Sequence, residues 1–235
     1  MSEELFREDS YARQCRAKAT AINDRGGIVL DRTVFYPTGG GQPGDSGTLR
    51  LEDGSEIEIA TTVYGDDRSI VHVPAESAVL PEPGAEIEAS IDWQRRYGRM
   101  RMHTALHLLS AVLPYPVTGG QIGEDRGRLD FDIPEAGLDR EDITQSLNRL
   151  IEADHEVRMR WINDEELDAR PELVKTMAVQ PPRGAGRVRL IEILDCDLQP
   201  CGGTHVARTG EIGPVLVDKI EKKGAQNRRV RLLFG

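Results

Sequence analysis

The spacing of apolar residues changes near residue 92 and divides the chain into two parts. Before that point, short runs such as 56–64 and 86–92 alternate apolar and polar residues between turns rich in Gly, Asp and Pro. This pattern is typical of the strands of a small β-barrel or sandwich. We therefore predict a β-barrel domain over residues 1–92 and a second domain over residues 93–235.

The second part begins with the pattern of a long helix. Four apolar residues recur at i, i+4, i+7 and i+11 on one helical stripe: Met102, Leu106, Leu109 and Leu113. Pro114 ends this helix, and a second helix is predicted over 138–157 with Asp139 as its N-cap. A strand is predicted over 187–194, and a closing hairpin around 224–227. Helices followed by strands indicate an α+β fold for this domain.

The composition is that of an ordinary globular protein. The 235 residues are 38% hydrophobic and 30% charged. No apolar run approaches the roughly 18 residues of a membrane span. Segment 1–10 is acidic and polar, unlike a secretory signal, so we expect a cytoplasmic protein with no membrane partner. Three cysteines are too few for a disulfide framework, and reduced thiols leave one of them available as a metal ligand.

The charge of the chain is unevenly distributed. A net charge of −10 argues against nucleic-acid binding, because phosphate contacts need Lys and Arg. However, segment 93–101 contains no acid and four arginines: Arg95, Arg96, Arg99 and Arg101. Segment 219–231 carries six cationic residues against Glu221 alone. A single charge run is usually a solvated surface, but two such runs favour a groove that binds a polyanion.

Two short motifs contain three of the five histidines and one cysteine. HTALH places His103 and His107 at i and i+4, on one face of the predicted helix. CGGTH places Cys201 and His205 in a glycine loop. Thiolate and imidazole are the ligands that four-coordinate Zn²⁺ prefers, so the sequence predicts a Cys-His₃ zinc site. A Cys201–His205 nucleophile is the alternative, but it leaves the two helix histidines unexplained.

The other histidines and cysteines are interpreted as structural: His72, His155, Cys15 and Cys196. Cys196 is nevertheless near enough to Cys201 in sequence to be an alternative ligand. Thr104 stands where zinc peptidases carry a glutamate base, so HTALH is not a peptidase motif. The segment 35–47, FYPTGGGQPGDSG, lacks the Lys-Ser/Thr of a phosphate loop. Its glycines fit either a tight turn between strands or a loop that closes over a site.

Taken together, HTALH, CGGTH and FYPTGGGQPGDSG resemble the AlaX-type alanyl-tRNA editing proteins, relatives of the editing domain of alanyl-tRNA synthetase. The glycine motif in a preceding domain resembles the medium-length class. The resemblance covers essentially the whole chain and implies a small β-barrel followed by an α+β editing domain. It also implies hydrolysis in trans of tRNA(Ala) charged with the wrong amino acid. Ser-tRNA(Ala) is the expected substrate, and Gly-tRNA(Ala) is the second candidate.

The resemblance implies roles for individual residues. The zinc ligands would be His103, His107, Cys201 and His205, and the substrate pocket would be lined by Gly39, Gly40 and Gly41. Thr118 and Gln121 are the candidate catalytic residues that contact the aminoacyl group. With tRNA as the implied substrate, phosphates of the acceptor stem are expected to contact Arg96 and Arg99, together with Arg95, Arg101 and the 219–231 hairpin.

The sequence leaves part of the chemistry open. Four protein ligands fill a tetrahedral zinc, so the ion either takes part in catalysis or only positions substrate and holds the fold. No carboxylate stands out as a general base, although Asp130 and Asp132 are candidates. A non-catalytic, zinc-stapled RNA-binding module is the competing interpretation. A metallohydrolase acting on a small ester or amide is a third.

Overall fold

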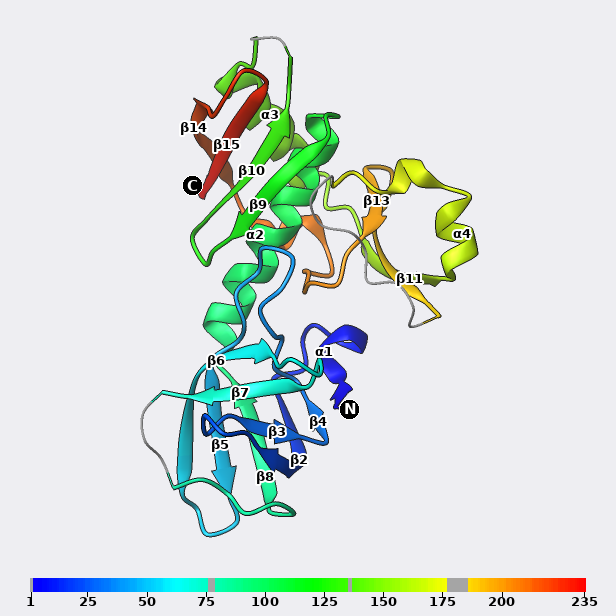
Figure 1. Ribbon diagram of the computed structural model, residues 1–235. Helices are drawn as coiled ribbons and strands as arrows, with labels where there is room; N and C mark the ends of the chain where they lie inside the picture. Colours follow the sequence, from blue (N-terminus) through cyan, green and yellow to red (C-terminus); the bar gives the residue numbers. More distant parts are fainter. Residues whose placement is uncertain (1, 76–78, 135–136, 177–185) are drawn as a thin grey trace. The chain divides into compact units, whose positions relative to one another are not determined.

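The computed structural model describes residues 2–75, 79–134, 137–176 and 186–235. They form two compact units, Met1–Tyr97 and Gly98–Gly235 (Figure 1). The predicted domain boundary after residue 92 falls at the start of helix α2 (Trp93–Val112), whereas the two units divide within that helix. No helix in the described ranges is long and apolar enough to cross a lipid bilayer.

The first unit is a closed β-barrel, as predicted. The order of strands around it is β2-β3-β7-β6-β5-β8. Their bounds are Gln14–Ile22 (β2), Ile28–Leu30 (β3), Gly47–Leu51 (β5), Glu56–Tyr64 (β6), Ile70–Pro74 (β7) and Glu86–Ile91 (β8). Ahead of the barrel, β1 (Glu3–Glu4) leads into the short helix α1 (Leu5–Glu8) and pairs in parallel with β4 (Arg32–Thr33).

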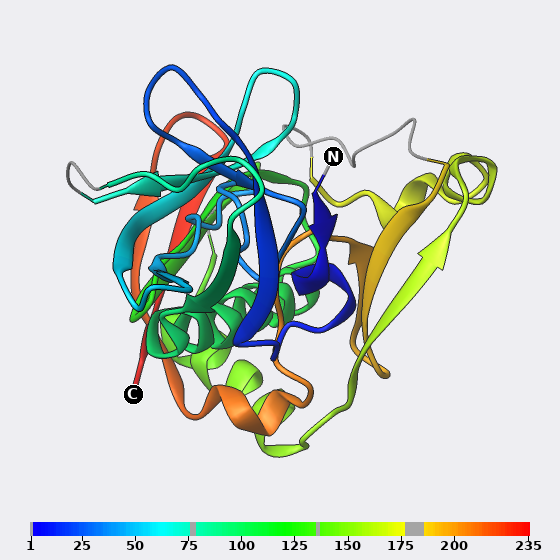
Figure 2. The same ribbon diagram turned by 90° about the horizontal axis from the view of Figure 1, so that it is seen from below.

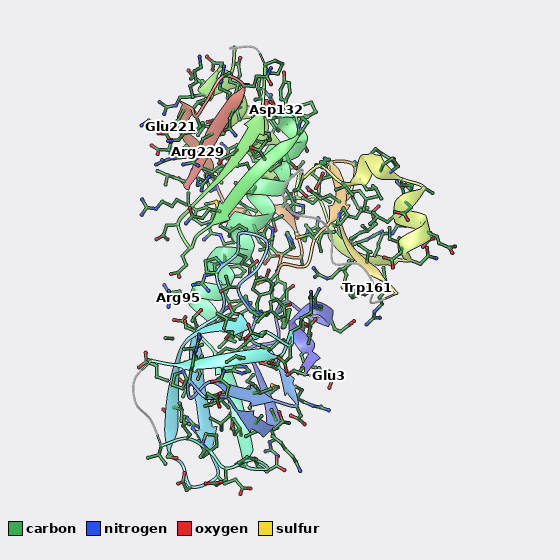
Figure 3. The ribbon with its side chains drawn as sticks, in the orientation of Figure 1. Glu3, Arg95, Asp132, Trp161, Glu221 and Arg229 are labelled. Carbon is green, nitrogen blue, oxygen red and sulfur yellow. The ribbon has the colours of Figure 1, made fainter. Side chains whose placement is uncertain are left out.

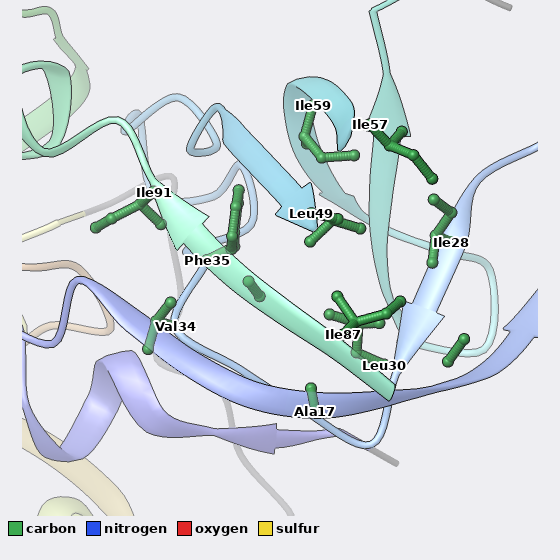
Figure 4. Packing of buried hydrophobic residues seen from close by; sticks show 12 residues of the cluster. Ala17, Ile28, Leu30, Val34, Phe35, Leu49, Ile57, Ile59, Ile87 and Ile91 are labelled. Carbon is green, nitrogen blue, oxygen red and sulfur yellow. The ribbon is translucent and has the colours of Figure 1, made fainter. Parts of the chain in front are cut away.

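Buried and exposed side chains alternate along the strands, and the buried ones form the barrel core. In β6, Ile57 and Ile59 are buried, whereas Glu56 and Glu58 are exposed. Figure 4 shows buried side chains from several strands pointing toward one another inside the barrel. Strand β5 was not predicted, because it is short and follows directly on the glycine-rich segment. It pairs with both β6 and β8 and so closes the barrel.

The second unit contains an antiparallel sheet in the order β14-β15-β10-β9. Its strands are Val117–Ile122 (β9), Arg126–Asp132 (β10), Val215–Lys222 (β14) and Asn227–Phe234 (β15). Helices α2 and α3 (Arg140–Glu152) cover one face of this sheet (Figure 1). Gly127 in β10 lies so close to α2 that an added Cβ would be 2.8 Å from the Met102 side chain. Asn148 in α3 donates a hydrogen bond to the Val215 carbonyl.

The helices agree with the sequence patterns except at one end. All four residues of the predicted stripe in and after α2 are buried. Asp139 is the N-cap of α3, and its side chain accepts hydrogen bonds from the backbone N–H groups of Glu141 and Asp142. The helix ends at Glu152 and not at 157, because Asp154 adopts a left-handed φ of 53° and the chain turns into strand β11.

A second, smaller antiparallel sheet positions the CGGTH loop. It consists of β11 (Val157–Ile162), β12 (Val188–Ile193) and β13 (Asp197–Pro200), in that order. Helix α4 (Asp164–Asp168) follows the end of β11, and the 3₁₀ turns η1 (Pro171–Leu173) and η2 (Thr209–Ile212) complete the unit (Figures 1 and 2). The chain leaves β13 at Pro200 and enters the CGGTH loop at the next residue.

Candidate metal centre

Helix α2 presents two different faces to its surroundings. Met102 and Leu106 face the four-stranded sheet at Gly127. His103 and His107, each one position further along, are also buried, and their ring centroids lie 5.2 Å apart. The i, i+4 spacing therefore places both imidazoles on one side of the helix, as predicted.

The CGGTH loop brings the other two predicted ligands to these histidines. Cys201 Sγ lies 3.5 Å from Nε2 of His103 and 3.3 Å from Nε2 of His205. One potential ligand atom from each of His103, His107, Cys201 and His205 lies within 4.8 Å of the other three. Zn–N bonds of about 2.0–2.1 Å and a Zn–S bond of about 2.3 Å give a tetrahedron whose sulfur–nitrogen edges are about 3.5 Å. The two sulfur–nitrogen separations match that geometry, so the donor set fits a tetrahedral metal ion.

Hydrogen bonds hold the ligand loop in place. Arg189 in β12 is buried, and its Nη1 donates to the carbonyls of Cys201 at 3.0 Å and Gly203 at 2.8 Å. The Cys201 N–H donates in return to the Arg189 carbonyl at 3.1 Å. The Gly203 N–H lies 3.4 Å from Cys201 Sγ, where it stabilises negative charge on the sulfur.

A buried carboxylate orients one of the histidines. Asp197 Oδ2 lies 3.1 Å from His107 Nδ1 and accepts a bond of 2.7 Å from Gln199 Nε2, while Lys175 Nζ pairs with the other oxygen. Burial alone would raise the pKa of Asp197, but His107 and Lys175 outweigh it and lower this pKa to about 2. An ionised Asp197 fixes the Nδ1 proton of His107, so the other ring nitrogen faces the ligand cluster.

Thr104 performs the same task for His205. Its hydroxyl donates to the Met100 carbonyl at 3.0 Å and lies 3.1 Å from His205 Nδ1. Because the hydroxyl proton is used at Met100, Thr104 accepts the Nδ1 proton of His205. That tautomer directs the Nε2 lone pair of His205 toward Cys201. Thr104, which stands where zinc peptidases carry a glutamate, is therefore the hydrogen-bond partner of a candidate metal ligand.

The electrostatics of the cluster favour the protonation states that ligands need. Burial alone would raise the pKa of Cys201, but the imidazoles of His103 and His205 bring it well below its ordinary value. Burial also lowers the pKa of His205 well below its ordinary value. For His107, burial acts to lower the pKa, but the hydrogen bond to Asp197 and the neighbouring Cys201 raise it to about 9. Metal ions bind thiolates and neutral imidazoles. His107 must therefore lose the proton on Nε2 when an ion binds, while the proton on Nδ1 stays with Asp197.

The glycine motif forms a tight turn in the first unit. Gly39 and Gln42 exchange backbone hydrogen bonds of 3.0 and 2.9 Å. Gly40 and Gly41 occupy the two central positions with φ of 56° and 83°, which side chains rarely adopt. Further along, a Cβ on Gly44 would lie 1.8 Å from the Thr62 carbonyl oxygen. The glycines are thus needed for the turn and for close packing, and Gly40 and Gly41 are exposed at its tip.

The two arginines predicted to bind phosphate are buried. Arg96 is fully buried and forms an ion pair with Asp45, and it also donates to the Val34 carbonyl at 2.6 Å. Arg99 is 4% exposed and pairs with Glu124 at 2.9 Å. Because Asp45 also accepts the Tyr36 N–H at 2.7 Å, Arg96 anchors the glycine motif within its own unit. Phosphate binding by Arg96 and Arg99 stays a prediction, and their burial fits a supporting role.

Thr118 and Gln121 both lie on β9, in the four-stranded sheet. Thr118 Oγ1 donates to the Asp130 carbonyl at 3.1 Å and accepts from Asn227 Nδ2 at 2.8 Å. Gln121 is exposed and accepts a hydrogen bond of 3.3 Å from Arg128. These contacts bind the strands to one another, and catalytic roles for Thr118 and Gln121 stay predictions. Asp130, a candidate base, forms ion pairs with Arg128 and Arg229.

Sequence reasoning missed the residues that support the ligands: Thr104, Lys175, Arg189, Asp197 and Gln199. One signal was available for two of them. Asp197 and Gln199 alternate along β13, and the next residue in that alternation is Cys201. Polar residues on the face of a strand that leads into a ligand predict contacts with that ligand's neighbours.

Comparisons with known proteins agree with this architecture. Residues 188–231 match the family model described as threonyl and alanyl tRNA synthetase second additional domain, and residues 8–95 match the model for tRNA synthetases class II (A). The chain is 36% identical to alanyl-tRNA editing protein AlaX-M of Methanosarcina acetivorans, with 98% of each chain covered. It is 34% identical to AlaX-M of Saccharolobus solfataricus, again with 98% of each chain covered.

A synthetase provides a further comparison. Alanine–tRNA ligase of Pyrobaculum neutrophilum is 35% identical over 93% of this chain, which corresponds to 25% of the ligase. The barrel, the α+β unit and the Cys-His₃ cluster thus define a protein of the synthetase-related editing class. The chain belongs to the AlaX-M family of alanyl-tRNA editing proteins.

Proposed function

We propose that this protein hydrolyses, in trans, the ester bond of tRNA(Ala) charged with the wrong amino acid. Ser-tRNA(Ala) would be the main substrate and Gly-tRNA(Ala) the second. The observation that carries the proposal is the convergence of His103, His107, Cys201 and His205, whose ligand atoms lie within 4.8 Å of one another. Family membership supplies the substrate class.

We also propose that the cluster holds Zn²⁺. A thiolate with three imidazoles at these separations suits zinc better than Mg²⁺ or Ca²⁺, which prefer oxygen ligands. Bound zinc would supply a Lewis acid beside the aminoacyl group. Asp197 and Thr104 would hold His107 and His205 in the tautomers that the ion requires. Arg189 would keep the loop carbonyls away from the ligand cluster, because its guanidinium binds two of them.

Selection of serine is proposed to depend on two further groups of residues. The exposed turn of Gly39, Gly40 and Gly41 is suited to close backbone contact with a small substrate. Thr118 and Gln121 would offer a hydroxyl and an amide to the serine side chain. A site that bonds a substrate hydroxyl discriminates by more than the size difference between serine and alanine allows. Arg96 and Arg99 would act indirectly, through the ion pairs with Asp45 and Glu124.

One observation favours a second candidate function, a zinc-stapled module that binds RNA without catalysis. Four protein side chains converge on one point, and four protein ligands are typical of structural zinc sites. In that case the ion would stabilise the loop between β13 and η2, and no ester would be hydrolysed.

Deacylation assays separate the two functions. Zinc-loaded wild type and Cys201→Ala are incubated with Ser-tRNA(Ala), Gly-tRNA(Ala) and Ala-tRNA(Ala), and release of the amino acid is followed. Cys196→Ala is the matched control, since it removes a thiol outside the cluster. We expect rapid loss of serine, sparing of alanine, and activity in Cys196→Ala but not in Cys201→Ala. A folded, zinc-loaded wild type that hydrolyses none of the three substrates would support the RNA-binding module.

A further inference from the structure

The four-stranded sheet of the second unit has one face against helices α2 and α3, and its other face carries charged side chains. We call this second face the basic sheet face. It consists of Arg128, Lys219, Lys223, Arg229 and Arg231 together with the carboxylates of Asp130 and Glu221. Figure 3 shows Glu221 and Arg229 beside each other over β14 and β15, and the register pairs these two residues.

Three cations lie in one row across this face. Lys219 on β14 is opposite Arg231 on β15, and Arg231 is opposite Arg128 on β10. Gln121 on β9 continues the row, because it is opposite Arg128. Like charges directly opposite each other destabilise a pair of strands. Glu221 and Asp130 offset part of the repulsion in this row, and a bound anion would offset more of it.

Two carboxylates hold the cations without neutralising them. Glu221 lies 3.4 Å from Lys219, 3.6 Å from Lys223 and 2.7 Å from Arg231. Asp130 forms ion pairs with Arg128 at 2.7 Å and with Arg229 at 2.8 Å. Each carboxylate thus serves more than one cation, and the cluster keeps a positive charge. Asp132 adds an acid at one end of the face, opposite Asn227.

Three of the five cations are well exposed, whereas the side chains of Arg128 and Arg229 are 25% and 20% exposed. The side chains of Lys219 and Arg231 are 60% and 41% exposed, and that of Lys223 is 40% exposed. The carboxylates beneath them are less exposed, with the side chains of Glu221 and Asp130 at 16% and 14%, so the cations form the outer layer of the cluster. The chain as a whole has a net charge of −10, which makes a local positive surface the part suited to a polyanion.

We propose that the basic sheet face binds the phosphate backbone of the RNA substrate, with Lys219, Arg231 and Arg128 contacting successive phosphates. This inference rests on the proposed function. Strands lie about 4.8 Å apart, so adjacent cations in the row are spaced closely enough to follow one nucleic-acid strand. Strand β10 and strand β15 each add an arginine to the row, and arginine forks bind phosphate through two N–H groups.

The test removes two charges from the row and two from elsewhere in the same unit. The first variant is Lys219→Ala with Arg231→Ala. The control is Arg158→Ala with Arg160→Ala, which removes two exposed arginines that also pair with carboxylates. KM and kcat are measured for Ser-tRNA(Ala) at several salt concentrations, and for 3′-O-seryl-adenosine, an ester without a phosphate backbone. Binding of uncharged tRNA is measured separately by filter retention.

The row variant should raise KM for Ser-tRNA(Ala) about tenfold or more and reduce the slope of log affinity against log salt by about 2, because two phosphate contacts are lost. Its kcat, and its activity on the short ester, should equal those of wild type. The control variant should change KM by less than about twofold. Arg231→Lys should keep the wild-type salt slope, since the charge remains, and should lose part of the affinity, since the fork of two N–H groups is lost.

The outcomes distinguish failure of this inference from failure of the proposed function. An unchanged KM and salt slope in the row variant, with an active wild type, would place the RNA elsewhere. An equal loss on the short ester would mean that the change acts through the fold, and it would also overturn the inference. If wild type hydrolyses no charged tRNA, the proposed function fails. Weaker filter binding of uncharged tRNA by the row variant would then still support the basic sheet face.

Discussion

His72 in the barrel and His107 in the candidate metal centre are both buried, yet their surroundings are opposite. Nδ1 of His72 lies 3.0 Å from the Ile28 carbonyl, and Nε2 lies 2.8 Å from the Thr33 hydroxyl. Neutral partners satisfy both nitrogens of a neutral ring, and burial lowers the pKa of His72 to about 4. Nδ1 of His107 instead meets the carboxylate of Asp197, and the pKa of His107 is raised to about 9 despite its burial.

The difference shows that burial alone does not identify a ligand histidine. The barrel uses both ring nitrogens of His72 within its own hydrogen bonds. The metal centre uses one nitrogen of His107 for orientation and directs the other toward a thiol and two more imidazoles. A carboxylate on one side of a ring and a cluster of ligand atoms on the other mark a metal-binding histidine.

The largest expected effect is loss of the bound metal when His107, but not His72, is replaced. His107→Gln should reduce retained zinc from about one ion per chain to less than about a tenth, because three ligands bind far more weakly than four. His72→Gln should leave the zinc content at the wild-type value. Elemental analysis after gel filtration measures both, with circular dichroism to verify the fold. Equal zinc loss in the two variants would contradict the claim that His107, and not His72, binds the metal.

The second effect is acid lability of the barrel. The unfolded chain protonates His72 near its ordinary pKa of 6.5, whereas the folded barrel does so only near 4. Stability is therefore lost as pH falls from about 6.5 to about 4, by about 3 kcal/mol in total at 1.36 kcal/mol per unit of pKa difference. Urea unfolding at pH 7 and pH 4.5, followed by Trp93 fluorescence in a Trp161→Phe background, measures the loss. A His72→Gln chain with the same pH dependence would refute this origin.

The third effect concerns the carboxylate that distinguishes the two sites. Asp197→Asn should weaken zinc binding about 10- to 100-fold, as expected for a residue that orients a ligand. It should also reduce the number of protons released on zinc binding near pH 7, since the raised pKa of His107 depends on Asp197. Calorimetry in buffers of different ionisation enthalpy reports both quantities. Asp195→Asn, an exposed neighbour with the same substitution, is the control. Matching affinities in the two variants would exclude a role for Asp197.

The smallest effect tests a neutral hydrogen bond like those around His72. Thr118→Val should slow hydrolysis of Ser-tRNA(Ala) about three- to tenfold, the worth of one neutral hydrogen bond, and leave the zinc content unchanged. Hydrolysis of Gly-tRNA(Ala), which offers no side-chain hydroxyl, should be nearly constant. Rates of amino-acid release from both substrates give the comparison. A parallel loss on both would mean that Thr118 acts through its bonds to Asn227 and Asp130.

Much of the fold was predictable from local patterns. The barrel, helix α2, the N-cap of α3 and strand β12 follow from alternation, a helical stripe and a capping residue. The short strands β5 and β9, both beside glycines, were not predicted, because pairing with neighbouring strands and not local sequence decides them. The early end of α3 depends on the left-handed backbone of Asp154, for which the sequence contains only a weak signal.

The cluster of His103, His107, Cys201 and His205 was predictable because the chemistry and spacing of these residues are specific, but the residues that support the cluster were not. Asp197 reaches His107 from 90 positions along the chain. The burial of Arg96 depends on Asp45, 51 positions away, so a run of arginines that looks solvated in sequence contains a buried anchor. Contacts of this range arise from tertiary packing. The spacing of residues within one segment of the sequence therefore does not predict them.

The hydrogen bonds from Arg189 to the CGGTH loop affect how the protein would respond to loss of a metal ion. Arg189 fastens the loop to β12 at Cys201 and Gly203, and Thr104 holds His205, so release of an ion would leave Cys201 and His205 close to their present positions. The chain would then lose and regain a zinc ion without unfolding, unlike small domains that fold only when the metal is bound. If the cluster holds zinc and the protein edits charged tRNA, as proposed, a zinc-starved cell would keep a reserve of folded, inactive protein. Editing activity would then return with zinc and without new synthesis.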